Sequence, residues 1–360
     1  MPDQLPPNFE SKENLSAVLH KAGDLRIEKT PLPEKPGKNE VVLKTSKVGI
    51  CGSDVSYWVK GYIGSFVVKE PMILGHETSA HVVAVGEGVT HLKPGDRVAI
   101  EPGVPCRYCV ACREGAYNVC PTIFFSATPP DHGTLTRYFK HAADFCYKLP
   151  DHVSDEEGAL MEPLSVAIHA CNRGNIKGGE VILICGAGPI GLMCLLTAKA
   201  FGVTNICITD INEARLEVAK NLGATTAVLL KKDLTPEATK DQIVTGLGRM
   251  PDTVFECSGV EASLQLAINA CKEGGIVVII GMGSNEVKLP IVTAACKELD
   301  IRGCFRYKHT WPKAVNLIAS GRIDVKPIIT HRFKLEQTID AFEMAKGGEA
   351  IKVVIDCDTE

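Results

Sequence analysis

The sequence predicts an α/β protein of two domains, one with a doubly wound parallel sheet and a smaller one rich in β-strands. Three observations carry this prediction. At 360 residues the chain exceeds the ~250–300 residues at which single cores stop growing. Apolar strand-like segments alternate with helix-like segments from 181 to 280, which is typical of a parallel sheet. Earlier, residues 15–48 alternate apolar and polar side chains between prolines and glycines, as short strands of a barrel or sandwich do.

Composition excludes several classes of protein. The hydrophobic fraction of 45% is that of an ordinary globular chain, and a net charge of −4 without a basic cluster speaks against nucleic acid and anionic membranes as partners. No apolar run approaches the ~20 residues of a membrane span. The first fifteen residues lack the patterns of secretory and mitochondrial signals, so we expect a cytoplasmic protein. Several of the 15 cysteines lie singly in apolar segments and are expected to be buried free thiols, namely Cys185, Cys194, Cys207, Cys257, Cys271 and Cys296.

Two polar exceptions interrupt the β-rich region. Cys51 follows an apolar strand in the run Val48-Gly49-Ile50-Cys51-Gly52-Ser53-Asp54, and His76-Glu77 follows Gly75. Cysteine, histidine and carboxylate together make a three-ligand catalytic zinc site with one open position. Taken singly, Cys51 could be a core thiol and His76-Glu77 a polar turn; taken jointly, they favour a metal site.

Four closely spaced cysteines follow in a loop with few apolar neighbours. Cys106, Cys109, Cys112 and Cys120 have the spacing CxxCxxCx7C, which predicts a closed tetrahedral zinc site within a lobe of about 104–122. They are too tightly spaced, and as we expect too exposed, for core thiols; disulfides are the alternative. Such a zinc has no open position, so it should order the lobe and do no chemistry.

Glu162 lies in an apolar helical stretch after Pro150. An isolated buried charge is costly, so a nearby metal or metal-bound water would be a fitting partner. The alternative is that Glu162 faces the surface.

The segment from Val181 to Asp210 combines strand, glycine turn, helix and second strand. Val181–Cys185 is continuously apolar, and Gly186-Ala187-Gly188-Pro189-Ile190-Gly191 follows at once, with a helix expected from Leu192 to Phe201. These glycines allow a tight turn, the approach of a pyrophosphate and close helix packing. A second strand ends at Asp210, whose carboxylate would accept bonds from the ribose diol and repel a 2′-phosphate. The pattern therefore predicts a Rossmann domain that prefers NAD to NADP, although Arg215 could support a phosphate.

The alternation of strands and helices continues beyond Asp210. We expect helices over 213–222 and 261–271, and strands over 227–230, 253–257 and 275–280. Ile280 and Met282 end a strand where a nicotinamide could lie; core packing explains these apolar residues equally well.

The chain resembles the zinc-dependent medium-chain dehydrogenases and, within them, the sorbitol (polyol) dehydrogenases. The resemblance covers nearly the whole chain. It rests on Val48–Asp54 with Tyr57-Trp58, Gly75-His76-Glu77, Pro94–Val98, Phe124-Phe125 with Ala127–Pro130, Glu162–Val166, and Phe305-Arg306-Tyr307 with Thr310-Trp311-Pro312.

The resemblance implies a GroES-like catalytic domain of residues 1–163 and 305–360, a Rossmann domain of residues 164–304, and a homotetramer. It places the catalytic zinc on Cys51, His76 and Glu77, with Glu162 close by and either glutamate able to be the direct ligand at rest; Ser53 would join the proton relay. Alcohol dehydrogenases have a cysteine at the position of Glu162, and this departure favours polyols. The resemblance assigns sugar-alcohol contacts to Tyr57, Phe125, Glu162, Arg306 and Tyr307. The cofactor contacts that we expect are Gly186, Gly188, Ile190, Gly191, Asp210, Arg215, Ile280, Met282 and Arg306.

These observations predict an enzyme that oxidises a sugar alcohol such as sorbitol or xylitol to the ketose and passes the hydride to NAD, reversibly, with one catalytic and one structural zinc. An arabinitol, threonine or simple-alcohol dehydrogenase on the same scaffold is the alternative within the class. A nucleotide-binding protein without turnover is the alternative outside it. The presence of Cys51, His76 and Glu162 disfavours the second alternative.

Overall fold

The computed structural model describes residues 5–231 and 233–358, which divide into two compact units. Unit 1 combines the chain up to Glu162 with Trp311–Ala319 and the segment from Val325 onward, and unit 2 comprises Pro163–Thr310 and Ser320–Asp324. In the described residues, no helix is both long and apolar enough to cross a bilayer.

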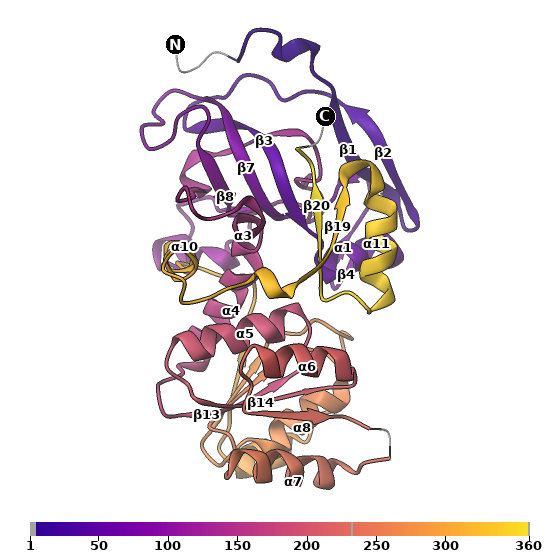
Figure 1. Cartoon of the computed structure of the whole chain (residues 1–360), viewed down its shortest axis with the longest axis vertical. Coiled ribbons are helices and arrows are strands. Elements are labelled where there is room, and N and C mark those ends of the chain that lie inside the picture. Colours follow the sequence, from indigo (N-terminus) through magenta and orange to yellow (C-terminus); the bar gives the residue numbers. More distant parts are fainter. Residues whose placement is uncertain (1–4, 232, 359–360) are drawn as a thin grey trace. The chain divides into compact units, whose positions relative to one another are not determined.

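A mixed sheet forms the centre of unit 1, with the strand order β12-β8-β7-β3-β20-β19. One edge of β3 pairs with β7, and the other edge is shared by β11 and β20, because β11 covers 40–44 and β20 covers 47–49. Figure 1 shows β20, from the end of the chain, beside β3 from its beginning. The bounds are β3 Glu40–Gly49, β7 Glu77–Val85, β8 Arg97–Ile100, β11 Tyr138–Ala142, β12 Cys146–Lys148, β19 Ile329–Lys334 and β20 Lys352–Asp356.

Smaller sheets and helices surround this sheet. The strand orders are β2-β1-β6, β9-β10 and β4-β5, with bounds β1 Asn14–Lys21, β2 Asp24–Thr30, β4 Tyr62–Ile63, β5 Phe66–Val67, β6 Met72–Ile73, β9 Gly103–Val104 and β10 Phe124–Phe125. The α-helices are α1 Gly52–Lys60, α2 Val110–Arg113, α3 Asp155–Ala159, α10 Trp311–Ala319 and α11 Thr338–Gly347. The 3-10 helices are η1 Phe9–Ser11, η2 Tyr117–Val119, η3 Ala143–Phe145, η4 Lys326–Ile328 and η5 Leu335–Gln337. Helices α1 and α11 meet in one apolar core, where the rings of Trp58 and Phe342 are in edge contact at 5.8 Å.

Unit 2 is a parallel sheet with the strand order β15-β14-β13-β16-β17-β18. All five residues of β13 are buried, as expected for a strand covered on both faces. Helices flank the sheet (Figure 1). The strands are β13 Val181–Cys185, β14 Asn205–Asp210, β15 Thr226–Leu229, β16 Thr253–Glu256, β17 Ile276–Ile279 and β18 Asp300–Gly303. The helices are α4 Met161–Gly174, which begins in unit 1, α5 Pro189–Ala200, α6 Glu213–Asn221, α7 Pro236–Leu247, α8 Glu261–Ala270 and α9 Ile291–Cys296.

The predicted α/β class with two kinds of domain is confirmed, and two local expectations are wrong. Helix α5 begins at Pro189 rather than Leu192, because proline fits the first helical position, where its missing N–H is not needed. All fifteen cysteines are free, but Cys296 is exposed and Cys257 is half-buried. Cys296 ends the short helix α9, whose Ile291 and Val292 are also exposed, so apolar neighbours in the sequence did not mean burial there.

Candidate functional site

Three potential metal ligands meet in unit 1, where one strand ends and its neighbour begins. Cys51 follows β3 and precedes α1, while Glu77 is the first residue of β7 and pairs with Gly49 in the antiparallel ladder. His76 adjoins Glu77, so the pairing of β3 with β7 brings all three side chains together. Their donor atoms lie within 4.8 Å of one another, and His76 and Glu77 are buried. A Cβ atom at Gly49 would collide with the Glu77 carboxylate, which explains a glycine at this point of the strand.

The donor set fits a zinc ion. A thiolate, an imidazole and a carboxylate are usual zinc ligands, and three protein ligands leave the fourth position of a tetrahedral site for water or substrate. The predicted ligands Cys51, His76 and Glu77 therefore form one compact group. Glu162 is buried in the first turn of α4 but does not belong to that group. Its charge nevertheless contributes to raising the pKa of Lys352.

Asp54 supports this group and was not singled out from the sequence. Its Oδ2 accepts a hydrogen bond from the Cys51 amide at 3.1 Å, and its Oδ1 accepts one from the Gly75 amide at 3.0 Å. Oδ1 also lies 3.5 Å from His76 Nδ1, which leaves Nε2 as the ring nitrogen for a metal. Burial opposes ionisation of Asp54, but His76 and the two amides outweigh it and lower the pKa. Asp54 is therefore an anionic support that orients His76.

Lys352 is a second support that was missed. It is 2% exposed, and its Nζ donates to both carboxylate oxygens of Glu77 at 2.7 Å and to the Ile50 carbonyl at 3.0 Å. Burial opposes the charge of Lys352, but Glu77 and Cys51 raise its pKa. Each oxygen of Glu77 keeps a further lone pair, so the ion pair leaves room for a metal. The available signal was a single lysine in the otherwise apolar run Ile351–Ile355.

The other predicted residues of unit 1 differ in burial, and one of them lies beside His76. The Phe125 ring is buried and its centroid is 6.1 Å from that of the His76 ring. Tyr57 is buried within α1, in the apolar core that contains Trp58. Ser53 is half-buried in the first turn of α1. Phe125 is thus an apolar neighbour of a candidate metal ligand.

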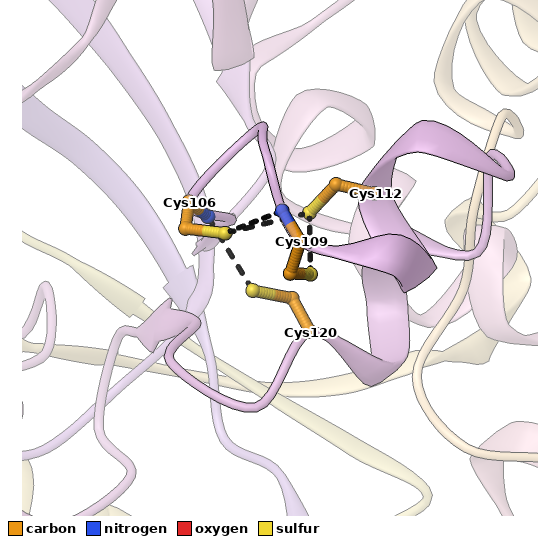
Figure 2. A group of neighbouring side chains, drawn as sticks. All are labelled: Cys106, Cys109, Cys112 and Cys120. Carbon is orange, nitrogen blue, oxygen red and sulfur yellow. Dashed lines mark hydrogen bonds between the residues drawn. The ribbon is translucent and has the colours of Figure 1, made fainter.

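The four cysteines of the lobe also converge. Figure 2 shows their side chains facing one another, and all four Sγ atoms lie within 4.8 Å. The Sγ atoms of Cys109 and Cys112 are 3.4 Å apart, and those of Cys106 and Cys112 are 3.9 Å apart. The amides of Tyr108 and Cys109 donate to Cys106 and lower its thiol pKa to about 6, which favours the metal-binding thiolate. The cluster fits a closed zinc site, although none of its cysteines is exposed as expected: Cys120 is buried and the other three are half-buried.

A buried carboxyl group connects the cysteine lobe to the sheet. Glu101, directly after β8, accepts hydrogen bonds from Tyr117 of the lobe at 2.9 Å and from Tyr147 of β12 at 2.8 Å. It is 1% exposed, and burial raises its pKa to about 7 against the opposing effect of the two tyrosine hydroxyls. Glu101 is the third functional candidate that the sequence did not suggest.

A pocket of about 530 Å³ in unit 2 is lined by the glycine turn and the end of β14. Gly186 has a φ of +105°, and a Cβ atom at Gly191 would collide with the Gly186 carbonyl, so both positions need glycine. Asp210 Oδ2 accepts a hydrogen bond from the Ala187 amide at 2.7 Å, which ties the turn to β14. Arg215 lines the same pocket. Glycine turn, helix start and carboxylate thus form a cradle that fits a dinucleotide.

The remaining predicted residues of unit 2 do not line this pocket. Ile280 and Ile190 are half-buried, and Met282 is 65% exposed. Arg306 has a φ of +53°, and its guanidinium lies 4.7 Å from the centroid of the Phe305 ring. Tyr307 is buried.

Comparisons with known proteins all indicate the zinc-binding dehydrogenases. Residues 37–151 match the family of alcohol dehydrogenase GroES-like domains, and residues 189–320 match the zinc-binding dehydrogenases. Sorbitol dehydrogenase of Gallus gallus is 54% identical over 346 residues, which cover 96% of this chain and 97% of that protein. Sorbitol dehydrogenase of Homo sapiens is 52% identical over 345 residues, with 96% of each chain covered.

Solved structures share the fold along most of the chain. An Escherichia coli oxidoreductase of unknown specificity superposes with a TM-score of 0.91 at 38% identity, covering 97% of this chain and all of the other. An Escherichia coli alcohol dehydrogenase in complex with NADH has a TM-score of 0.88 at 27% identity, covering 96% of this chain and all of the other.

Proposed function

Because the chain belongs to the sorbitol dehydrogenases, within the zinc-binding dehydrogenases, we propose that it oxidises a secondary hydroxyl of a sugar alcohol to the ketone, reversibly, with NAD as hydride acceptor. One observation carries the proposal: a Cys-His-Glu group with zinc-ligand chemistry occurs in the same chain as a glycine cradle that ends in an aspartate. When bound, zinc polarises the substrate hydroxyl and NAD takes up the hydride.

The residues of the chain supply position and electrostatics for this chemistry. Cys51, His76 and Glu77 would hold the catalytic zinc, and Asp54 and Lys352 orient two of these three ligands through the contacts described above. The four-cysteine cluster would hold the structural zinc. We retain Glu162 and Ser53 as candidates for moving the substrate proton.

The cofactor preference follows from Asp210. Its carboxylate borders the pocket beside the glycine turn, where it can accept hydrogen bonds from the ribose hydroxyls and repel a 2′-phosphate. Gly186, Gly188, Asp210 and Arg215 line the pocket and are the cofactor contacts that we propose from this geometry; Ile190, Gly191, Ile280, Met282 and Arg306 remain proposals from the sequence.

We also propose the substrate contacts, the domain bounds, the oligomeric state and the location of the protein. Tyr57, Phe125, Glu162, Arg306 and Tyr307 are the proposed sugar-alcohol contacts, of which Phe125 has support from its place beside His76. We propose that residues 1–163 and 305–360 form the catalytic domain and residues 164–304 the cofactor domain. We also propose a homotetramer in the cytoplasm.

The decisive experiment measures kcat/KM for sorbitol, xylitol, ribitol, arabinitol, threonine and a simple primary alcohol, each with NAD and NADP, together with the zinc content per chain. We expect turnover of at least one polyol with NAD, and zinc at both metal-binding groups. Turnover of the simple alcohol alone would contradict the polyol assignment. Zinc-loaded protein that binds NADH without turning over any substrate would identify the non-catalytic alternative.

A further inference from the structure

Glu256 is a buried carboxylate at the carboxyl end of β16 that the reaction does not use directly. It is fully buried, and the described hydrogen-bond partners of its carboxylate are Ser258 and Gly259. Oε1 accepts bonds from the Ser258 amide at 2.9 Å, the Ser258 hydroxyl at 2.5 Å and the Gly259 amide at 3.1 Å. Oε2 accepts a second bond from the Gly259 amide at 3.0 Å. Two successive amides therefore point inward at one anion, which is the arrangement of a backbone anion nest.

The segment that Glu256 holds lies against the loop after β17. A Cβ atom on Gly259, which has a φ of +71°, would come within 2.6 Å of the Gly283 amide nitrogen, and one on Gly281 or Gly283 would collide with the backbone of Gly259. The main-chain carbonyl of Glu256 also accepts bonds from the amides of Ile280 and Gly281 at 2.9 Å. The loops after β16 and β17 thus touch backbone to backbone, without side chains that could adjust. A small displacement of Gly259 must be passed on to the loop after β17.

The same segment forms part of the wall of the proposed cofactor pocket. Cys257, Ser258 and Val260 line this pocket together with the glycine turn. The Cys257 amide donates to the Cys185 carbonyl at 2.9 Å, directly before Gly186. Strands β13 and β16 are neighbours, and the chain leaves β13 towards β14 on its other side, so this is the point where the strand order reverses. Ligands of such sheets bind outside the carboxyl ends of the strands at this point.

We propose that Glu256 is a positioning residue for the dinucleotide: its carboxylate fixes the segment 257–260 in the conformation that completes the cofactor pocket. The inference rests on the proposed function, because it names a determinant of affinity for NAD. Without the anion, the inward amides of Ser258 and Gly259 lose their acceptor and the segment samples other conformations. If the competent conformation falls to about a tenth of the population, the apparent affinity falls about tenfold.

The test compares two carboxylates at opposite ends of β16. Glu256→Gln keeps the size of the side chain but points an amide NH2 at backbone donors. Asp252→Asn is the matched control, because Asp252 directly precedes β16, is buried, and bonds to Arg249, Lys272 and the Val181 amide, outside the residues that line the pocket. NADH binding is followed by fluorescence titration of the zinc-loaded protein, and KM for NAD and kcat are measured on the preferred polyol.

We expect Glu256→Gln to raise the Kd for NADH and the KM for NAD about tenfold, while kcat changes less than about twofold. Asp252→Asn should lower thermal stability and leave both cofactor constants within about twofold. Equal NADH affinity of Glu256→Gln and the wild type, or equal weakening in both variants, would overturn the inference. Failure of the wild type to bind NADH would instead contradict the proposed function.

A second variant covers the case in which Glu256→Gln does not fold. Ser258→Ala removes the hydroxyl that donates to Glu256 and accepts from the Val260 amide at 3.2 Å, while leaving the carboxylate paired with two amides. We expect its KM for NAD to rise about threefold with kcat unchanged. An unchanged KM in this variant would refute the role of the segment.

Discussion

Lys352→Met should destabilise the metal-free protein by about 3–5 kcal/mol, because it leaves the Glu77 carboxylate buried without its cation. The two side chains are 2% and 1% exposed, and Nζ contacts both oxygens of Glu77 at 2.7 Å, so water cannot replace the lost partner without rearrangement. Methionine has nearly the same length and occupies the space of the lysine stem. The cost therefore arises from the charge rather than from a cavity.

The measurement is the free energy of unfolding from urea titration of chelator-treated protein, for Lys352→Met, Glu77→Gln and the double variant. The double variant removes both charges, so it should be more stable than the sum of the two single losses predicts. Lys220→Met is the control for an exposed ion pair: Lys220 and Glu217 are 54% and 62% exposed, and the change should cost less than about 1 kcal/mol. Zinc should stabilise Lys352→Met more than the wild type, because the ion supplies a cation next to Glu77.

Two outcomes would refute this reasoning. If Lys352→Met costs no more than Lys220→Met, the buried pair is not retained in solution. If the double variant loses the full sum of the single variants, the two charges do not interact, and the contact at 2.7 Å carries no coupling.

Three further predictions concern the other supports. Between pH 4.5, the ordinary pKa of a glutamate, and about 7, the pKa of Glu101, this one carboxyl group binds more protons in the folded protein than in the unfolded chain, so its contribution to stability should fall by on the order of 3 kcal/mol as the pH rises through this window. Glu101→Gln should remove that contribution, and the same pH dependence in variant and wild type, from urea titrations at pH 5 and 8, would contradict the assignment. Asp54→Asn removes the anion beside His76 and should weaken zinc binding about 10–100-fold in chelator competition, with NADH affinity as the unchanged control. Cys106→Ser should lose the zinc of the lobe but keep that of the Cys51 group, and make residues 104–122 sensitive to protease; a full zinc content would disprove the four-cysteine assignment.

The parts of the fold that the sequence predicted well are those with a local signal. The strand Val181–Cys185 is continuously apolar and buried on both faces, so its sequence and structure agree residue for residue. The start of α5 was misplaced by three residues, because an apolar pattern indicates the buried face of a helix and not its first turn. At Cys296 the local pattern failed for a different reason: its short helix leaves Ile291 and Val292 exposed, and no sequence period reveals which face remains uncovered.

The convergence of Cys51, His76 and Glu77 was predictable because side chains of zinc-ligand chemistry stand at recognisable points of the chain. Cys51 follows a strand, and His76-Glu77 precedes another, so two short motifs named all three residues. Lys352 was not predictable in this way, because it lies 275 residues from Glu77 and only the pairing of β20 with β3 brings it there. Glu256 was missed for the opposite reason. Its hydrogen-bond partners are its nearest neighbours in the sequence, and an acidic residue at the end of a strand is common.

Three buried glutamates show how the local environment assigns a role to the same side chain. Glu77 faces the ammonium group of Lys352, which compensates its burial, and it is a candidate metal ligand. Among the described residues, Glu101 pairs with two tyrosine hydroxyls and no cation, and burial raises its pKa to about 7. Glu256 faces two backbone amides and a hydroxyl, which fix the path of the chain around it.

The position of Lys352 also means that unit 1 needs the segment after Val325 to compensate the charge of Glu77. The first 162 residues contain Cys51, His76, Glu77 and all four lobe cysteines, yet the cation beside Glu77 and the strand that covers residues 47–49 of β3 lie beyond Val325. A chain that ends before β20 would expose an unpaired edge of β3 and leave a buried carboxylate uncompensated. Unit 2 is therefore inserted into unit 1, in which the charge that compensates Glu77 comes from β20.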